Sequence, residues 1–149
     1  MDGFTSFMDA ALAEARAAAL AGEVPVGAVV VREGVVIARA RNRMRELVDP
    51  TAHAEMLAIR EACRVLGSER LTGCDLWVSL EPCPACAGAI AAARLSRLYY
   101  AASDPKSGGV AQGPRVFDHP QAHWAPEIYG GIGEAEAAAL LKDFFAARR

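Results

Sequence analysis

The stretches Asp49-Pro50-Thr51-Ala52-His53-Ala54-Glu55 and Glu81-Pro82-Cys83-Pro84-Ala85-Cys86 decide how this chain is expected to fold and what it can bind. They contribute one imidazole, two thiols and a carboxylate two residues from the imidazole. Zinc is commonly bound by nitrogen and sulfur ligands, and a set of three protein ligands leaves a fourth position open for chemistry. We therefore expect one catalytic zinc ion, bound by His53, Cys83 and Cys86.

Glu55 is expected to work beside the metal rather than to bind it. Residues two apart on a helix point in different directions, so the Glu55 carboxylate can reach a metal-bound water while His53 binds the ion. Zinc lowers the pKa of such a water to ~7, and Glu55 would then accept its proton as a general base. Glu81, just before the cysteines, is either a second acid or a strand-end residue that sets the following loop.

Two other interpretations of the cysteines remain open. A C-x-x-C pair is often a redox pair or half of a structural zinc site. A closed zinc site would need a fourth ligand, which either Cys63 or Cys74 could supply. Cys63 falls on the apolar face of its expected helix, which favours burial in the core, and Cys74 follows Gly73 in a turn.

The composition is that of a globular protein. The chain has 149 residues, of which 53% are hydrophobic and 23% charged, and this predicts one domain spanning residues 1–149. It contains neither an apolar run long enough for a bilayer nor the start of a signal peptide, so we expect a cytoplasmic protein without membrane contact. The formal net charge of -2 argues weakly against nucleic acid as a partner, unless the basic residues are concentrated locally.

Hydrophobic periodicity predicts a three-layer α/β domain, in which helices cover a sheet that begins with a hairpin. Helices are expected over residues 4–21, 52–66, 82–94 and 134–147, and strands over 26–31, 35–40, 76–80 and 98–102. In the last helix, the inward residues are expected to be Ala138, Leu141, Phe144 and Phe145. Residues 103–130 contain much of the Gly and Pro and are expected to form a loop with short irregular pieces.

The pattern H-x-E followed by P-C-x-x-C is the known signature of zinc-dependent nucleobase deaminases. Residues 22–30, 49–55, 79–90 and 144–149 extend the likeness, and with them the chain resembles the bacterial tRNA adenosine deaminases, which convert the wobble adenosine of an anticodon loop to inosine. This resemblance implies a cytidine-deaminase-like α/β/α fold with a mixed central sheet, one zinc ion per subunit and a homodimer. The implied reaction is hydrolytic deamination with release of ammonia.

The resemblance also assigns residues to the substrate. It implies that Asn42 hydrogen-bonds the flipped-out nucleotide, that Val24 and Pro25 form an apolar wall against the base, and that Asp104 lies near the ribose. Without the resemblance, Val24 and Pro25 would be interpreted as ordinary packing at the start of a strand, and Asn42 as a turn residue.

Basic residues follow the end of the second expected strand. If the chain stays extended there, the alternating arginines of residues 39–45 share one face. Such runs are usually solvated surface, but with the resemblance we expect them to contact the phosphates of a tRNA anticodon stem-loop. The expected RNA contacts are Arg39, Arg41, Arg43, Arg45, Lys106, Arg148 and Arg149.

Two other functions are consistent with the sequence. A deaminase of a free nucleobase or nucleoside, such as cytosine or guanine, would share the zinc chemistry, and a non-catalytic zinc-stabilised RNA-binding module would not need Glu55. Within residues 107–130, Trp124 either stacks on a base or packs in the core or an interface. His119 and His123 lack the surrounding carboxylates expected of a second metal site.

Overall fold

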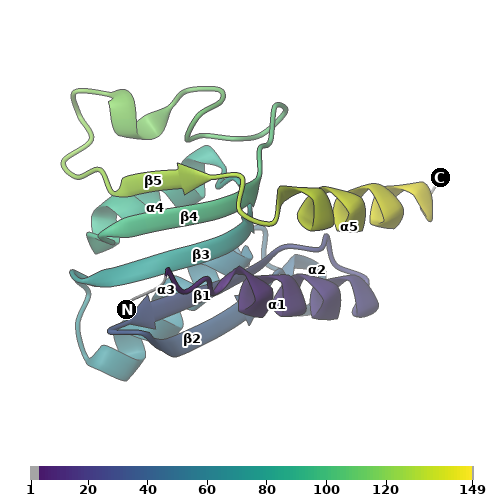
Figure 1. Cartoon of the computed structure of the whole chain (residues 1–149), viewed down its shortest axis with the longest axis horizontal. Coiled ribbons are helices and arrows are strands. Elements are labelled where there is room, and N and C mark those ends of the chain that lie inside the picture. Colours follow the sequence, from purple (N-terminus) through teal and green to yellow (C-terminus); the bar gives the residue numbers. More distant parts are fainter. Residues whose placement is uncertain (1–3, 149) are drawn as a thin grey trace.

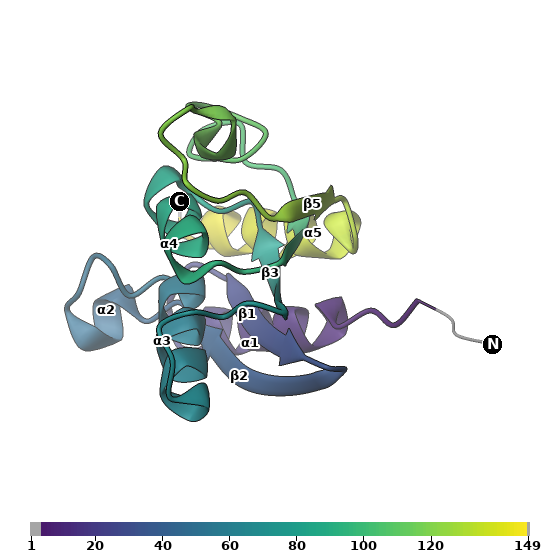
Figure 2. The same ribbon diagram turned by 90° about the vertical axis from the view of Figure 1, so that its left-hand side faces the viewer.

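The structure is a computed structural model that describes residues 4–148. A five-stranded sheet lies between two layers of helices (Figures 1 and 2), which confirms the predicted three-layer α/β/α fold. The strands are β1 (Gly27–Arg32), β2 (Val35–Arg41), β3 (Cys74–Leu80), β4 (Arg97–Ala102) and β5 (Glu127–Gly130). The helices are α1 (Met8–Leu20), α2 (Met44–Leu47), α3 (Ala54–Leu66), α4 (Pro84–Ala93) and α5 (Glu134–Ala146), with a 3-10 turn at Val116–Asp118.

The sheet is mixed, as expected. Its strand order is β2-β1-β3-β4-β5; β1 is antiparallel to both of its neighbours, whereas β3, β4 and β5 run parallel to one another. The hairpin between β1 and β2 turns at Glu33 and Gly34, which both have positive φ values (52° and 75°). Two such residues form the primed turn whose twist matches that of antiparallel strands.

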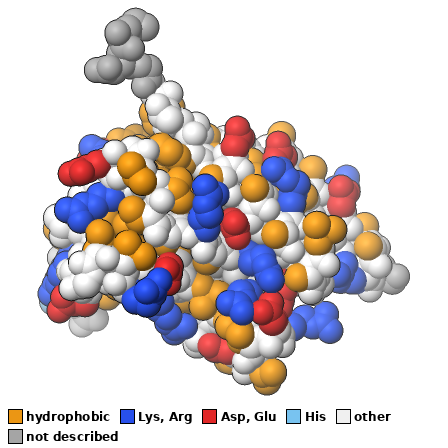
Figure 3. Space-filling view, turned by 90° about the horizontal axis from the view of Figure 1, so that it is seen from below, with side chains coloured by type: hydrophobic (Ala, Val, Ile, Leu, Met, Phe, Trp, Pro, Cys, Tyr) orange, Lys and Arg blue, Asp and Glu red, His pale blue; other side chains and the backbone are white. Residues whose placement is uncertain are grey.

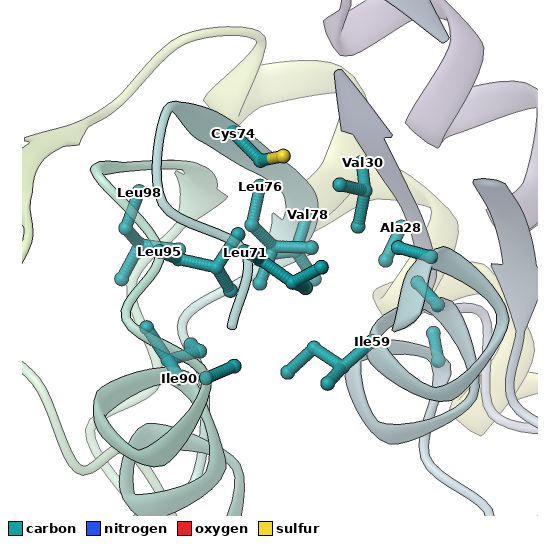
Figure 4. Packing of buried hydrophobic residues seen from close by; sticks show 14 of the residues in the cluster. Ala28, Val30, Ile59, Leu71, Cys74, Leu76, Val78, Ile90, Leu95 and Leu98 are labelled. Carbon is teal, nitrogen blue, oxygen red and sulfur yellow. The ribbon is translucent and has the colours of Figure 1, made fainter. Parts of the chain in front are cut away.

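Each face of the sheet has its own hydrophobic core. Helices α1 and α5 cover one face through residues such as Met8, Leu12 and Ala137. Helices α3 and α4 cover the other, where the side chains of Ile59 and Ile90 point toward those of the strands (Figure 4). Because both α3 and α4 pack on the same face, their first turns lie side by side at one end of the sheet.

Helix α1 approaches β1 closely at Gly27. A Cβ atom there would lie only 2.1 Å from the Ala11 carbonyl oxygen and 2.4 Å from the Ala15 nitrogen, so only glycine fits. The Gly27 N–H donates to Ser79 Oγ on β3 at 3.1 Å. These contacts fix the start of β1, and with it the preceding residues 24–26.

Three features differ from the sequence prediction. Helix α2 and strand β5 were not expected; all four residues of β5 are exposed, so this short edge strand lacks the apolar alternation that marks a strand. Of the residues predicted to face inward in α5, Phe144 is buried as predicted, but the prediction is wrong for Ala138 and Phe145, which are exposed; α5 buries Ala137 in addition. No helix among residues 4–148 is long and apolar enough to cross a membrane.

Candidate metal centre and active site

The predicted metal ligands lie at the starts of α3 and α4. His53 and Cys83 are the N-cap residues of these helices, both with extended backbone dihedrals, and Pro84 occupies the first turn of α4. Proline suits that position because the first N–H groups of a helix have no intrahelical partner. Cys86, also in the first turn of α4, is buried. The two adjacent helix starts therefore bring one imidazole and two thiols together.

The distances within this group fit zinc. His53 Nδ1 lies 3.7 Å from Cys83 Sγ and 3.5 Å from Cys86 Sγ, and all three ligand atoms lie within 4.8 Å of one another. A tetrahedral zinc ion with Zn–S bonds of ~2.3 Å and Zn–N bonds of ~2.0 Å places nitrogen and sulfur ligands about 3.5 Å apart. Among residues 4–148, this is the only such group found.

The closed four-ligand alternative is not supported by the geometry. Cys74 is fully buried in the core beneath α3 and α4, and Cys63 packs against the same core from α3. Neither belongs to the ligand group found among the described residues. The set of three ligands thus leaves a fourth coordination position open, as in catalytic zinc sites.

The three ligand side chains have shifted pKa values, because they lie close together. The hydrogen bond to Cys86, followed in importance by the hydrogen bond to His53, lowers the pKa of the Cys83 thiol to about 3. The interaction with Cys83, together with burial, raises the pKa of Cys86, and the hydrogen bond to Cys83 raises that of His53. These three groups share protons that a bound metal displaces, because metal-ligating thiols are deprotonated.

Glu55 lies in the first turn of α3, next to the ligand group but outside it. Its side chain is buried, with an exposed fraction of 4%. Burial raises the pKa of the Glu55 carboxyl to about 7, so the group can both accept and release a proton near neutral pH. Its burial and position suit a proton carrier beside the metal, and that role stays a prediction.

A small pocket of about 160 Å³ opens beside the ligand group. Val24 forms part of its wall as predicted, whereas Pro25 is buried and absent from the lining, where Val26 is found instead. Met44, Leu80 and Ser107 also line it, although no sequence pattern pointed to them. The full lining is Val24, Val26, Asn42, Met44, His53, Glu55, Leu80, Glu81, Cys83, Asp104 and Ser107.

The Asn42 side chain also makes hydrogen bonds to the protein backbone, which the sequence did not predict. Its Oδ1 accepts a hydrogen bond from the Ala54 N–H at 2.8 Å, and its Nδ2 donates to the Val24 carbonyl oxygen at 3.2 Å. It therefore ties the start of α3, directly after His53, to the pocket wall. An amide nitrogen carries two N–H groups, so one donor is left by these two bonds.

Glu81 directly follows β3, contacts the loop that follows β4 and does not belong to the metal group. It accepts hydrogen bonds from backbone N–H groups of this loop, including those of Asp104 and Val110. Burial acts to raise the pKa of the Glu81 carboxyl, but these N–H donors outweigh it and lower the pKa. Of the two roles left open by the sequence, the geometry favours that of a residue that sets the loop.

A larger groove of about 700 Å³ adjoins the pocket and shares Val24, Leu80, Asp104 and Ser107 with it. It brings together Lys106 and Arg148, which are far apart in the sequence. The remaining lining residues are Ser103, Leu141 and Phe145, and the Phe145 side chain is exposed. Arg149, also expected to contact RNA, lies outside the described residues.

The arginines expected on one strand face separate into two groups. Strand β2 ends at Arg41, and Arg45 lies on the short helix α2, so the expectation of one continuous face is wrong beyond the strand. Arg39, Arg41 and Arg43 nevertheless line one groove of about 530 Å³. Its other lining residues are Glu14, Ala40, Leu57, Arg60, Glu61 and Arg64.

Strand β2 lies at the lower edge of the sheet in Figure 1, and the view from below shows basic and acidic side chains interspersed (Figure 3). Arg41 and Arg43 form ion pairs with Glu46, and Arg64 pairs with Glu61. Arg39 and Arg60 are exposed. The groove thus combines five arginines with carboxylates that already neutralise some of them.

In the segment 107–130, Trp124 is half-buried and packs against the protein's own residues. Its indole N–H donates to the Leu95 carbonyl oxygen at 2.7 Å, and the Arg94 guanidinium lies 5.8 Å from its ring centroid. His119 and His123 are exposed and line a groove against α4, and no metal-ligand group contains them among the described residues.

Comparison with known proteins gives consistent matches. Residues 2–102 match the family model of the cytidine and deoxycytidylate deaminase zinc-binding region. The tRNA-specific adenosine deaminase of Agrobacterium fabrum is 56% identical over 145 residues, covering 97% of this chain and 95% of that protein. The corresponding enzyme of Aquifex aeolicus is 46% identical, with 93% and 91% covered.

Solved structures show the same fold. A structure from studies of A-to-I editing by tRNA:A34 deaminases at the wobble position of transfer RNA has a TM-score of 0.90 and 57% identity, covering 91% of this chain and 98% of that one. A guanine deaminase from Nitrosomonas europaea has a TM-score of 0.83 at 25% identity, with 97% and 87% covered.

The metal set can be tested by substitution. We expect Cys86→Ser to lose zinc, because a hydroxyl is a poor replacement for a thiolate ligand. Glu55→Gln should keep one zinc ion per chain, since Glu55 lies outside the ligand group. Elemental analysis of the purified variants measures both, and loss of zinc from Glu55→Gln would show that Glu55 is a ligand.

Proposed function

Because this chain belongs to the cytidine and deoxycytidylate deaminase family of zinc-binding enzymes, and within it to the tRNA-specific adenosine deaminases, we propose that it converts adenosine to inosine at the wobble position of a tRNA anticodon loop. The whole chain, residues 1–149, forms the proposed deaminase domain, and its substrate would place it in the cytoplasm. The observation that carries the proposal is the buried Glu55 beside an open three-ligand metal set, at the bottom of a pocket that continues into a longer groove.

Metal binding and proton transfer are assigned to different residues. His53, Cys83 and Cys86 hold the zinc ion, which when bound supplies Lewis-acid activation of a water molecule. Glu55 takes a proton from the attacking water and delivers it to the ring nitrogen next to C6. It then takes the second proton from the new C6 hydroxyl and passes it to the exocyclic amine. The C6–N bond breaks as the C6 carbonyl forms, so that adenine and water give hypoxanthine and ammonia.

The pocket residues bind and orient the base. Val24 and Val26 offer apolar surface to its faces, and the remaining N–H of Asn42 can donate a hydrogen bond to it. Asp104, on the rim shared by pocket and groove, is suited to contact the ribose. Ordering these groups in advance reduces the entropic cost of reaching the transition state.

The groove beside the pocket supports RNA rather than a free base as the substrate. It continues outward from the pocket with an exposed aromatic ring, Phe145, and two cationic side chains, Lys106 and Arg148. Aromatic rings stack on unpaired bases and cations bind phosphates, which is the usual way that proteins recognise single-stranded loops. A deaminase of a free nucleobase remains the alternative, because guanine deaminases share the fold.

Incubation with a synthetic anticodon stem-loop tests the reaction directly. We expect inosine at the wobble position and one ammonia per inosine. Glu55→Gln should lower the rate by at least about 1,000-fold, because Glu55 serves as both base and acid and each role is typically worth 10²–10⁴. The control substrates are the same stem-loop with guanosine at that position and free adenosine, cytosine and guanine. Ammonia from a free base but none from the stem-loop would establish the alternative.

We further propose that the RNA backbone follows two basic surfaces. One is the groove with Lys106 and Arg148. The other is the β2 groove with Arg39, Arg41 and Arg43, which adjoins the pocket through Asn42, the residue directly after Arg41. Arg45 would contribute from α2. These local clusters offset the formal net charge of -2 of the whole chain.

Salt dependence measures these contacts. The affinity for the stem-loop should fall steeply with salt, and Lys106→Ala and Arg148→Ala should each reduce the slope of log K against log salt by about 1. Arg16→Ala is the matched control, because Arg16 is exposed on α1 and lines neither groove. Slopes identical to that of the control would remove these two residues from the RNA surface.

We also propose a homodimer, with α4 near the interface and RNA in contact with both subunits. The outer side of α4 presents the small residues Gly88, Ala91 and Ala92 to an open groove of about 410 Å³. Small side chains allow a second subunit to approach closely, and a dimer would cover this apolar surface.

Light scattering tests this arrangement. Wild type should have twice the chain mass of 15.7 kDa. Ala92→Glu should shift the mass toward the monomer, because a buried unpaired charge at an interface is costly. Thr72→Glu, an exposed substitution outside this groove, should not. A monomeric wild type at micromolar concentration would contradict the proposal.

A further inference from the structure

Glu81 is a buried charged side chain that no step of the proposed reaction uses. Its exposed fraction is 2%, and it stands directly after β3, two residues before Cys83. A buried carboxylate is costly unless its oxygen atoms accept several hydrogen bonds. The partners of these two oxygens therefore indicate what the residue is for.

Both Glu81 oxygens are occupied by one loop, residues 103–112. Oε1 accepts from Ser103 Oγ at 3.1 Å and from the Asp104 N–H at 3.0 Å. Oε2 accepts from three successive backbone N–H groups, those of Val110, Ala111 and Gln112, at 3.1, 2.9 and 3.0 Å. The single carboxylate thus joins the two ends of the loop.

Two glycines show how tightly the loop is held. A Cβ atom on Gly108 would lie 2.6 Å from Glu81 Oε2, and one on Gly109 would lie 2.6 Å from the Pro84 nitrogen. The Gly109 N–H also donates to the Pro82 carbonyl oxygen at 2.8 Å. The loop is therefore packed against the carboxylate on one side and against the turn that carries Cys83 on the other.

The middle of the same loop carries substrate-facing residues. Asp104 and Ser107 line both the pocket and the groove, and Lys106 lines the groove. Asp104 Oδ1 accepts hydrogen bonds from the N–H groups of Lys106 and Ser107, so these three residues move as one turn. Both ends of the loop that contains this turn depend on the carboxylate of Glu81.

We propose that Glu81 is a positioning residue that holds the substrate-facing loop 103–112 in register with the metal-binding turn. Its carboxylate is needed because both oxygens must accept; the amide of glutamine would turn an N–H₂ group toward backbone donors. The identity of the substrate rests on the proposed function, but the holding of the loop does not.

The substitution Glu81→Gln tests this in the full-length zinc-loaded protein. Loss of hydrogen bonds to a charged group should raise hydrogen exchange at the amides of residues 110–112 about 10- to 100-fold. Zinc content should remain one ion per chain. With the wobble-adenosine stem-loop, KM should rise about ten-fold while kcat changes less than about three-fold, because binding rather than proton transfer is impaired.

Gly108→Ala provides a second loop variant, since its new methyl group would lie 2.6 Å from the Glu81 carboxylate and equally close to the Asp104 carbonyl oxygen, and so would press on the contact between Glu81 and the loop. It should reproduce the faster exchange and the raised KM. Glu23→Gln is the matched control. Glu23 is equally buried and also accepts backbone N–H groups, but those of Arg45 and Glu46 at α2, so exchange at residues 110–112 should stay unchanged.

Three results would overturn the proposal. These are unchanged exchange at residues 110–112 in both loop variants, loss of zinc as the main defect of Glu81→Gln, or a fall in kcat with KM unchanged. If wild type does not deaminate the stem-loop, the proposed function fails, whereas exchange and zinc content still decide whether Glu81 holds the loop. If Glu81→Gln does not fold, Gly108→Ala decides the same question.

Discussion

The site depends on one constraint, that the first turns of α3 and α4 start side by side at the same end of the sheet. The chain satisfies it through the crossover from β3 to the parallel strand β4, because α4 in such a unit starts where β3 ends. Helix α3 precedes β3 and packs on the same face as α4. The antiparallel pairing of β1 with β2 and β3 brings the start of β1 and the end of β2 to this end as well. One topology thus gathers the pocket wall, Asn42, the metal ligands and the loop after β4.

Buried polar side chains fix the arrangement of these segments around the pocket. Glu23, Asn42, Ser79 and Glu81 each accept a hydrogen bond from the backbone N–H of a distant segment, and each of these segments lies beside the pocket or leads into it. A buried acceptor without a partner would cost about 1–3 kcal/mol, so these bonds specify one arrangement of the loops. Glu55 differs from this group, since it lines the pocket and burial raises its pKa to about 7. Its desolvation suits the proton transfer proposed for it, whereas the hydrogen bonds of the other four side chains fix the positions of backbone segments.

The sequence predicted the metal group and Glu55 because their spacing follows directly from ligand chemistry and from two helix starts. It predicted the three-layer fold because hydrophobic residues recur at helical spacing in α3 and form continuous apolar runs in strands β1 and β3. It did not predict β5, whose exposed residues carry no pattern, or the inward side of α5, where alanines surround the few large side chains and leave the helical phase ambiguous. The sequence also did not predict the hydrogen bonds that Asn42 and Glu81 make to the protein backbone. A polar residue next to a turn gives the same sequence pattern whether its side chain binds substrate or a backbone group.

The chemistry and the choice of substrate reside in different parts of the chain. The family match covers residues 2–102, which contain the three metal ligands and Glu55 but end just before Asp104. The groove residues Lys106, Phe145 and Arg148 lie beyond that match. A fold shared with guanine deaminases at 25% identity therefore accounts for hydrolytic removal of an amine, and says little about the base. The likeness to tRNA-specific adenosine deaminases extends over 97% of the chain, so it includes the loop that Glu81 holds and the helix α5 that closes the groove. In the proposed function, discrimination between RNA and a free base is assigned to these two segments, whereas the metal centre is common to the family.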